Sequence, residues 1–285
     1  MILVLGRSGQ VATELARQAP AARLLGRVEA DLSEPGAAAR IVEAALDDGV
    51  TAVINAAAYT AVDRAEAEEE RAARVNAEAP GLIATACAAR NIPLVHLSTD
   101  YVFDGTGTAP RAPGAAPAPL GAYGRTKLAG EEAVRAAAGP HAILRTAWVF
   151  SPHGANFVKT MLRLSETREA LGIVSDQIGG PTPAAAIAAA CLTIAEALRT
   201  DPALAGTYHY AGAPEVSWAD FARAIFAAAG RAVEVTDIAT ADYPTPARRP
   251  LNARLDCTAT EAAFGLTRPD WHAGLRATLK ELAAQ

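Results

Sequence analysis

Tyr123 and Lys127 stand four positions apart in the segment Tyr-Gly-Arg-Thr-Lys, shortly after an apolar run that ends at Thr99. Residues four apart lie on one face of a helix, so the Lys127 ammonium is expected to lower the pKa of the phenol from its reference value of ~10. The Thr99 hydroxyl, at the end of a strand, is placed to hold a carbonyl oxygen beside that phenol. Together these groups suit reduction of a carbonyl by hydride, although a solvated Tyr and Lys on a surface helix would share the spacing.

The beginning of the chain carries a second chemical signal. An apolar run from Ile2 to Leu5 breaks at Gly6 and Gly9, and a helical pattern follows. Gly6 permits a tight turn, Gly9 lets the backbone approach a pyrophosphate, and the helix N-terminus supplies N–H donors. Ala12 stands where a third glycine would ease packing of the helix on the strand. In an alternating strand–helix chain this pattern predicts dinucleotide binding, whereas alone it would often be only a turn.

Strand and helix patterns alternate along the chain. The expected strands are Ile2–Leu5, Ala22–Leu25, Thr51–Asn55, Leu94–Ser98, Ala142–Arg145 and Ala170–Val174, and the expected helices are Glu14–Gln18, Pro35–Asp47, Glu68–Arg90 and Tyr123–Ala138. Such alternation predicts an α/β fold, a Rossmann-like doubly wound parallel sheet with helices on both faces. We expect residues 1–150 to form the dinucleotide-binding domain. Residues 151–285 are expected to form a smaller substrate-binding lobe, interleaved with the last sheet elements.

Several segments are expected to be framework or surface. The Pro-, Gly- and Ala-rich stretch from Gly105 to Gly121 predicts an ordered loop and a candidate wall of the site. Ala184–Leu198 predicts a buried helix, because it is too short and too polar to span a membrane. The acidic cluster Glu66–Glu70 is most simply a solvated helix start.

Composition narrows the class of protein. With 285 residues and a net charge of −5, the chain has room for a large core and no signal for a nucleic-acid or membrane partner. No basic region and cleavage site precede the first strand, and Cys87, Cys191 and Cys257 lack metal or disulfide spacing. These features predict a cytoplasmic protein with reduced thiols. The five histidines share no ligand spacing, so no catalytic metal is predicted.

Taken in order, the motifs resemble those of the extended short-chain dehydrogenase/reductase family and, within it, the dTDP-4-dehydrorhamnose reductases. The likeness spans nearly the whole chain. The segments that carry it are Gly6–Val11, Ile54–Asp63, Ser98–Gly105, Tyr123–Glu131, Arg145–Phe150, Asn156–Met161, Asp176–Thr182 and Arg249–Arg254. The resemblance implies reduction of the C4 keto group of dTDP-4-dehydro-β-L-rhamnose, with a nucleotide sugar as substrate and a homodimer as one oligomeric state open to the family.

The resemblance also implies roles for the matched residues. Tyr123 would be the general acid, Lys127 would bond the nicotinamide ribose, and Thr99 would orient the keto oxygen. The residues expected to contact the cofactor are Gly6, Arg7, Gly9, Gln10, Val11, Arg27, Asp31, Leu32, Ala57, Ala58, Tyr59 and Thr60, together with Tyr123 and Lys127. Those expected to contact the substrate are Thr99, Asp100, Trp148, Asn156 and Arg249, with Arg248 beside it. Without the resemblance, Trp148 would be expected in the core.

Cofactor preference is predicted from the end of the second strand. NAD-specific enzymes place a carboxylate there, but here Leu25 runs into Gly26-Arg27 and no acidic residue occurs before Glu29. Arg7 and Arg27 could each hold a 2′-phosphate, while Asp31 lies close by. We therefore expect NADPH to be preferred and NADH also to be accepted.

Two points stay open at this level. Glu281 matches a position where some relatives share a magnesium ion across a dimer, but a lone terminal Glu is more often surface, and Mg²⁺ is not predicted. Two other functions fit the same motifs. One is a different nucleotide-sugar ketoreductase or a 4-epimerase. The other is a non-catalytic NADP-binding protein like the regulatory subunit of methionine adenosyltransferase.

Overall fold

A six-stranded, entirely parallel sheet forms the centre of the computed structural model, which describes residues 1–46 and 49–284. Its strands run in the order β2-β1-β3-β4-β5-β10. They are β1 (Ile2–Leu5), β2 (Arg23–Leu25), β3 (Ala52–Asn55), β4 (Leu94–Thr99), β5 (His141–Thr146) and β10 (Gly206–His209). Since the chain order reverses between β1 and β3, the carboxyl ends of these strands border the crevice where ligands bind in doubly wound sheets.

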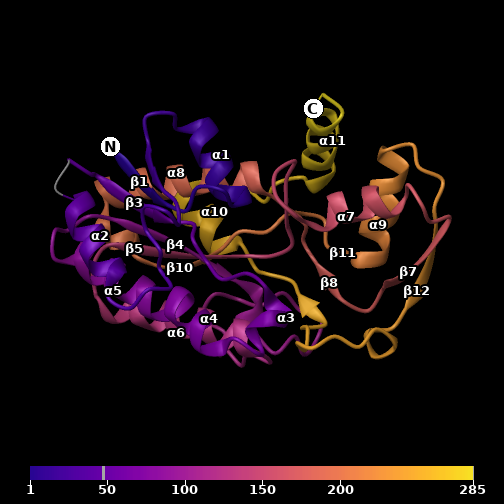
Figure 1. Cartoon of the computed structure of the whole chain (residues 1–285), viewed down its shortest axis with the longest axis horizontal. Helices are drawn as coiled ribbons and strands as arrows, with labels where there is room; N and C mark the ends of the chain where they lie inside the picture. The colour runs from indigo at the N-terminus through magenta and orange to yellow at the C-terminus, as the bar shows by residue number, and fades with distance from the viewer. Residues whose placement is uncertain (47–48, 285) are drawn as a thin grey trace.

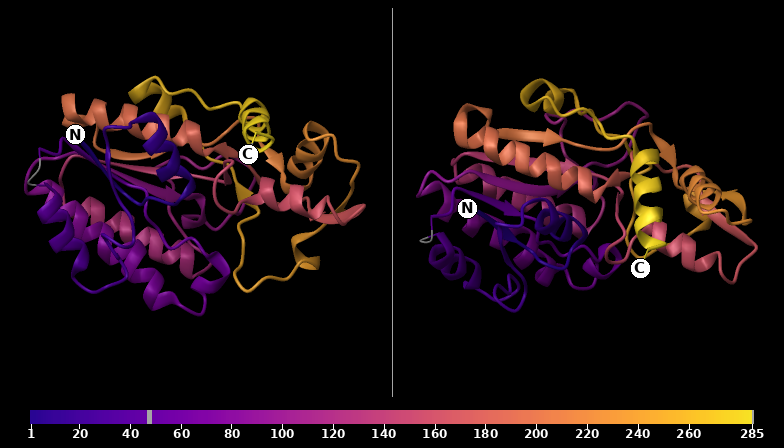
Figure 2. Two further views of the ribbon diagram at one scale, coloured as in Figure 1. Left: turned by 45° about the horizontal axis from the view of Figure 1, so that its top comes forward. Right: turned by 90° about the horizontal axis from the view of Figure 1, so that it is seen from above.

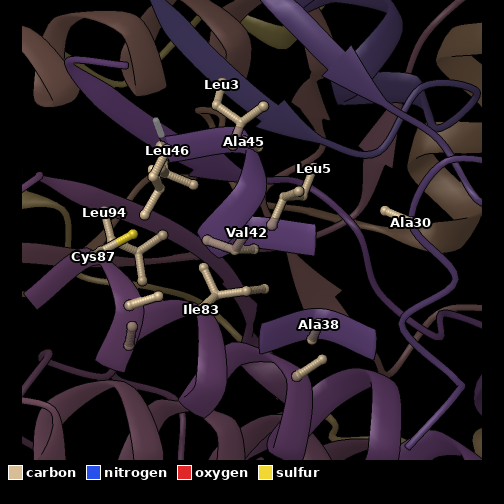
Figure 3. Packing of buried hydrophobic residues seen from close by; sticks show 14 of the residues in the cluster. Leu3, Leu5, Ala30, Ala38, Val42, Ala45, Leu46, Ile83, Cys87 and Leu94 are labelled. Carbon is tan, nitrogen blue, oxygen red and sulfur yellow. The ribbon is translucent and has the colours of Figure 1, made fainter. Parts of the chain in front are cut away.

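Helices cover both faces of this sheet (Figure 1). One face carries α2 (Ala37–Leu46), α4 (Glu69–Ala73), α5 (Ala79–Ala88) and α6 (Ala122–Ala136), and the other carries α1 (Gln10–Gln18), α8 (Ala184–Thr200) and α10 (Thr258–Phe264). Successive side chains of a strand point to opposite faces of the sheet, so each strand contributes residues to the core on both faces. Leu3 and Leu5 pack with Val42 and Ile83 in one cluster (Figure 3), whereas Val4 packs with α8 in another.

A smaller lobe lies at one end of the sheet (Figure 2). It holds α7 (Phe157–Leu164), α9 (Trp218–Ala228) and α11 (Trp271–Leu282), around an aromatic cluster that includes Phe150, Phe221 and Trp271. Its short strands are β6 (Val149–Phe150) with β9 (Thr182–Pro183), β7 (Ala170–Val174) with β12 (Glu234–Ile238), and β8 (Ile178–Gly179) with β11 (Val216–Ser217) and β13 (Asn252–Ala253). The chain re-enters the main sheet between these parts, through α8 and β10.

The prediction of a doubly wound parallel sheet is confirmed, with one strand assigned wrongly. Ala170–Val174 is a strand, but it pairs with β12 in the lobe, and β10 completes the main sheet instead. The hydrophobic pattern of β7 could not reveal its partner. The expected helix Glu68–Arg90 is a continuous helical run from Glu69 to Ala88 that contains one π-helical turn, Arg74–Glu78. Position 47 of the expected helix Pro35–Asp47 lies outside the described residues.

Other expectations concern the framework. Ala184–Leu198 is a buried helix within α8, and no helix of the described residues is long and apolar enough to span a bilayer. The three cysteines are buried and free. The segment from Gly105 to Gly121 is a loop as predicted, but none of its residues lines the cavities described below.

A buried ion pair fastens α6 to the sheet. Glu131 is fully buried on α6, and its carboxylate accepts from Arg145 Nη2 at 2.6 Å and Nε at 2.8 Å. Ser98 Oγ on β4 donates to the same carboxylate at 2.6 Å. Burial alone would raise the pKa of Glu131, but the hydrogen bonds and charge of Arg145 outweigh it and hold the pKa below its usual range. The pair therefore stays ionised in the core.

We expect Arg145→Met to lower the free energy of unfolding by ~3–5 kcal/mol, because it removes the buried partner of the Glu131 carboxylate and leaves only the partly exposed Arg135. Equilibrium urea denaturation measures this change. Arg199→Met is the matched control, since Arg199 pairs with Glu196 at the surface, where such pairs contribute ~0–1 kcal/mol. Equal effects of the two substitutions would contradict the role given to the buried pair.

Candidate active site

Acidic residues of the preceding helices position the first turn of α6. Glu66 Oε1 accepts from the backbone N–H of Ala122 at 2.8 Å, and Glu69 holds Arg125 through two hydrogen bonds of 2.9 Å. Glu66–Glu70 is an exposed helix start as predicted, with Glu69 and Glu70 in the first turn of α4, and two of its carboxylates also anchor the helix that carries Tyr123. Their partners lie more than fifty residues further along the chain and are invisible in the local sequence.

The π-helical turn makes a second contact with α6. Asn76, fully buried in this turn, donates to Thr126 Oγ1 at 3.2 Å and accepts from the backbone N–H of Tyr59 at 2.8 Å. At Gly130 a Cβ would lie 1.9 Å from the carbonyl oxygen of Asn76, so only glycine lets the two helices approach. The helix that carries Tyr123 and Lys127 is thereby tied to the loop after β3.

Tyr123 and Lys127 face one cavity of about 580 Å³, here called the Tyr–Lys cavity. It lies at the carboxyl ends of β1, β3, β4 and β5. The predicted site residues that line it are Gly9, Gln10, Val11, Ala58, Thr60, Thr99, Asp100, Tyr123, Lys127 and Trp148. Residues from five separate segments therefore meet here, as the sequence predicted.

Burial controls the protonation of Tyr123. It raises the pKa of the phenol to about 12, with a smaller upward contribution from the charge of Asp100, while a hydrogen bond with Thr99 acts in the opposite direction. The expectation that Lys127 lowers this pKa is wrong, because Lys127 Nζ is directed to β4, where it donates to the carbonyl of Leu97 at 2.7 Å. The phenol is therefore protonated at neutral pH, which is the form that a general acid requires.

Lys127 is itself an unusual cation. Its side chain is 1% exposed, and burial lowers the pKa of its ammonium to about 8, against an upward contribution from the nearby Glu131. A lysine of this kind gains or loses its proton within the range where enzymes operate.

Two buried oxygens beside the cavity have no hydrogen-bond partner among the described residues. They are Asp100 Oδ2 and Thr146 Oγ1, from residues that both line the Tyr–Lys cavity. Asp100 Oδ1 accepts from Thr99 at 3.0 Å, and burial raises the pKa of the Asp100 carboxyl to about 7. Unpaired buried polar atoms are costly, so this corner suits a polar ligand. Thr146 was not predicted, since a lone Thr at a strand end carries no signal.

A second cavity, of about 410 Å³, opens at the glycine turn between β1 and α1 and is here called the glycine-turn cavity. The predicted residues that line it are Gly6, Arg7, Gly9, Arg27, Asp31, Leu32, Ala57, Ala58 and Tyr59. Gly6 has φ +110°, where side chains are strained, and a Cβ on Gly9 would meet no atom within 4 Å. The open space at Gly9 in front of the N-terminus of α1 fits the pyrophosphate of a dinucleotide.

The two cavities are adjacent. Ser8, Gly9, Ala56 and Ala58 line both of them. A single elongated ligand could therefore run from Asp31, past the glycine turn, to Tyr123 and Lys127.

Charged residues of the glycine-turn cavity differ from expectation in two respects. Arg7 Nη1 pairs with Glu29 at 2.6 Å, and Glu29 also accepts from the backbone N–H of Gly26 at 3.0 Å, so this carboxylate lies just beyond β2. Arg71 lines the cavity beside Arg27 and was not predicted, because it follows the acidic cluster and resembles its surface counterion. Asp31 accepts from Ser33 N and Oγ, and these hydrogen bonds lower the pKa of its carboxyl.

Trp148 lies between the Tyr–Lys cavity and the lobe. Its ring stacks on Trp218 with centroids 3.5 Å apart, and a Cβ on Gly179 would come within 2.7 Å of it. Its backbone has φ +50°, a conformation that costs non-glycine residues ~1–3 kcal/mol and is concentrated at functional sites. Trp148 is thus held at the cavity by the lobe, half-buried and outside the main core.

Two predicted substrate residues lie elsewhere. Asn156 caps α7, accepting from Lys159 N at 3.2 Å and donating to Gln10 Oε1 at 3.0 Å. Arg249 forms a two-pronged pair with Asp63, at 3.0 and 2.8 Å. Neither lines the Tyr–Lys cavity, and their contact with a diphosphate stays a prediction. Both instead hold segments of the lobe against the sheet domain, because their polar groups are already paired.

Glu281 also has a cationic partner. Arg17 Nη1 lies 3.0 Å from both of its carboxylate oxygens and 3.2 Å from Glu14. Among residues 1–46 and 49–284, no group of three or more His, Cys, Asp or Glu side chains could hold a metal ion. Arg17 therefore pairs with both Glu14 and Glu281.

The family described as RmlD substrate binding domain matches residues 1–284. A dTDP-4-dehydrorhamnose reductase from Sinorhizobium fredii is 43% identical, over 96% of this chain and 95% of its own. The enzyme of that name from Burkholderia thailandensis is 44% identical, over 100% and 99%.

Solved structures agree with these relatives. A dTDP-4-dehydrorhamnose reductase from Bacillus anthracis, in complex with NADP, superposes with a TM-score of 0.89 at 31% identity, over 98% of each chain. The structure of an orthologue from Clostridium acetobutylicum gives 0.89 at 33% identity, over 99% of each chain. The motif order, the two adjoining cavities and these full-length similarities lead to one conclusion: the chain belongs to the dTDP-4-dehydrorhamnose reductase family.

Proposed function

We propose that this protein reduces the C4 keto group of dTDP-4-dehydro-β-L-rhamnose to give dTDP-β-L-rhamnose, with NADPH as the preferred reductant. The observation that carries the proposal is the junction of the two cavities at Gly9 and Ala58. It would bring a dinucleotide held at the glycine turn to the groups Thr99, Tyr123 and Lys127. The full-length similarity to reductases of that name supports the same reaction.

Each residue of the site has a separate role in the proposed reduction. Bound NADPH would supply the hydride for the C4 carbon. Tyr123, protonated at neutral pH, donates its proton to the carbonyl oxygen, and Thr99 orients that oxygen through its hydroxyl. Lys127 lines the same cavity and binds the ribose of the dinucleotide through its nitrogen. Asp100 and Thr146 supply the unpaired polar atoms that face the sugar, and Trp148 packs against the nucleotide sugar from the lobe.

An NADPH-oxidation assay against a panel of nucleotide-linked 4-keto sugars tests the proposal, with product identity determined by NMR. We expect turnover with dTDP-4-dehydro-β-L-rhamnose, one NADP⁺ formed per alcohol. A tightly retained NAD with no net oxidation of added cofactor would identify an epimerase instead. Absence of turnover with every sugar, despite NADPH binding, would favour the non-catalytic alternative.

We expect Tyr123→Phe to reduce kcat by ~10²–10⁴-fold, since the ring is preserved and only the donated proton is lost. The dissociation constant for NADPH, measured by fluorescence titration, should change little. Tyr101→Phe is the matched control, because this neighbouring ring meets Tyr123 edge-on, with centroids 5.4 Å apart, but is not proposed as a donor. A Tyr123→Phe enzyme with more than about a tenth of wild-type kcat would assign the proton to another group.

The ratio of kcat/KM for NADPH over NADH is expected to be about ten, equivalent to ~1.4 kcal/mol. Arg27→Ala should shrink this ratio, because Arg27 lines the glycine-turn cavity where a 2′-phosphate would lie. Steady-state kinetics with both cofactors measures it. Arg40→Ala serves as control, since Arg40 is exposed and lines neither cavity. A wild-type preference for NADH would refute the assignment.

Trp148→Ala should raise KM for the nucleotide sugar substantially while lowering the melting temperature only slightly, because the ring is half-buried at the cavity. The contrasting variant is Trp271→Ala, in which a ring that is 2% exposed is removed from the lobe core. That change should cost ~3–5 kcal/mol of stability. A large stability loss with normal KM in Trp148→Ala would make Trp148 a core residue.

A further inference from the structure

A row of buried polar side chains runs from β3 through β4 to Lys127 on α6. Asn55 and His96 are register partners on β3 and β4, and Lys127 follows on α6. Their side chains are at most 1% exposed. Asn55 and His96 line neither cavity, so substrate or cofactor contact does not account for them.

The hydrogen bonds of Asn55 determine which nitrogen of His96 carries a proton. The backbone N–H of Ala57 donates to Asn55 Oδ1 at 3.2 Å, which directs the amide Nδ2 to His96 Nδ1, also at 3.2 Å. An amide nitrogen only donates, so Nδ1 must accept. Burial and the neighbouring Lys127 hold the pKa of His96 well below its usual value, so the ring is neutral. Its single proton is therefore on Nε2.

This tautomer has a consequence for Lys127. His96 Nε2 lies 3.4 Å from Lys127 Nζ, and Nζ donates to the Leu97 carbonyl at 2.7 Å. An ammonium has donors only, so it would face the Nε2–H donor to donor. A neutral amine has a lone pair that accepts from Nε2–H while it still donates to Leu97. Only the amine gives every contact in the row one donor and one acceptor.

We propose that Asn55 and His96 are positioning residues that favour the amine of Lys127 over its ammonium, so that the ammonium releases its proton more readily during reduction. The carbonyl oxygen gains the proton that Tyr123 loses. The ammonium form of Lys127 then gives one proton to the phenolate and becomes the amine, and the amine takes a proton from water to restore the ammonium. The use of the released proton rests on the proposed function, whereas the tautomer and the Lys127 equilibrium are properties of the resting protein.

The ionisable groups around Lys127 come from three elements. They are His96 on β4, Tyr123 and Glu131 on α6, and Arg145 on β5, which pairs with Glu131. Glu131 favours the ammonium, but its charge is shared with Arg145 and Arg135. Burial and the His96 donor favour the amine. With the pKa near 8, both forms are accessible under working conditions.

The first test determines the tautomer of His96 by long-range ¹H–¹⁵N correlation NMR of the wild-type protein at neutral pH. The chain has five histidines, so replacing His141, His153, His209 and His272 one at a time by Gln assigns His96 by elimination. We expect the proton on Nε2 and the lone pair on Nδ1. A proton on Nδ1 would overturn the proposal, without bearing on whether the enzyme turns over.

The second test titrates Lys127 by ¹³Cε NMR, in a chain whose only lysines are Lys127, Lys159 and Lys280. Lys159→Arg and Lys280→Arg assign the other two signals. In Asn55→Asp the carboxylate accepts from both Ala57 N–H and Nδ1–H, which moves the ring proton to Nδ1. His96 Nε2 then accepts from the ammonium. We expect the Lys127 midpoint to rise by about one pH unit, a tenfold change in the equilibrium.

The double variant Asn55→Asp, His96→Phe controls for the added negative charge. It keeps the carboxylate but has no ring nitrogen to face Lys127. A midpoint that returns toward the wild-type value supports the proposal, and a midpoint that stays as high as in Asn55→Asp assigns the whole shift to charge and overturns it. The wild-type tautomer measurement decides the matter if the double variant does not fold.

Discussion

The ion pair between Glu131 and Arg145 is the interaction on which the site depends, because it holds α6 against the sheet with its polar side chains buried. Charge is expensive to bury unless every lone pair and proton is matched. Here the Glu131 carboxylate receives Arg145 from β5 and Ser98 from β4, one residue before Thr99. This arrangement fixes α6 relative to both strands, so Lys127, one turn earlier, is presented to the ends of β3 and β4.

The same packing explains how Lys127 can be buried. Its nitrogen satisfies one donor with the Leu97 carbonyl and lies against His96, whose other side is held by Asn55. Tyr123, one turn nearer the helix start, is buried too, but its pKa is driven upward and it keeps its proton. Burial thus raises the pKa of the phenol and lowers the pKa of the ammonium. The first shift keeps the proton that Tyr123 donates, and the second lets the Lys127 ammonium release its proton more readily.

The lobe completes the site by reaching back to the sheet domain. Asp63, in the first turn of α3 (Val62–Ala65), holds Arg249, and Gln10 holds Asn156. Each of these contacts joins residues more than a hundred positions apart in the chain. Trp148, whose ring stacks on Trp218 of the lobe, lines the Tyr–Lys cavity. The walls of this cavity therefore come from the ends of the sheet strands and from residues 148, 149, 154 and 155 beside the lobe.

The sequence by itself determined the sheet class, the glycine turn and the group Thr99, Tyr123 and Lys127, because each rests on local periodicity or on a short motif at a strand end. Only the tertiary structure decided what those side chains meet. In the structure β10, and not β7, completes the main sheet. Glu66 and Glu69 form hydrogen bonds to the first turn of α6. Asn156 and Arg249 form hydrogen bonds to partners within the protein. The tertiary structure also reversed the expected direction of the Tyr123 pKa, since desolvation depends on the whole environment and not on the i, i+4 spacing. Strand pairing, ion-pair choice and burial all join residues distant in sequence, and no local pattern carries that information.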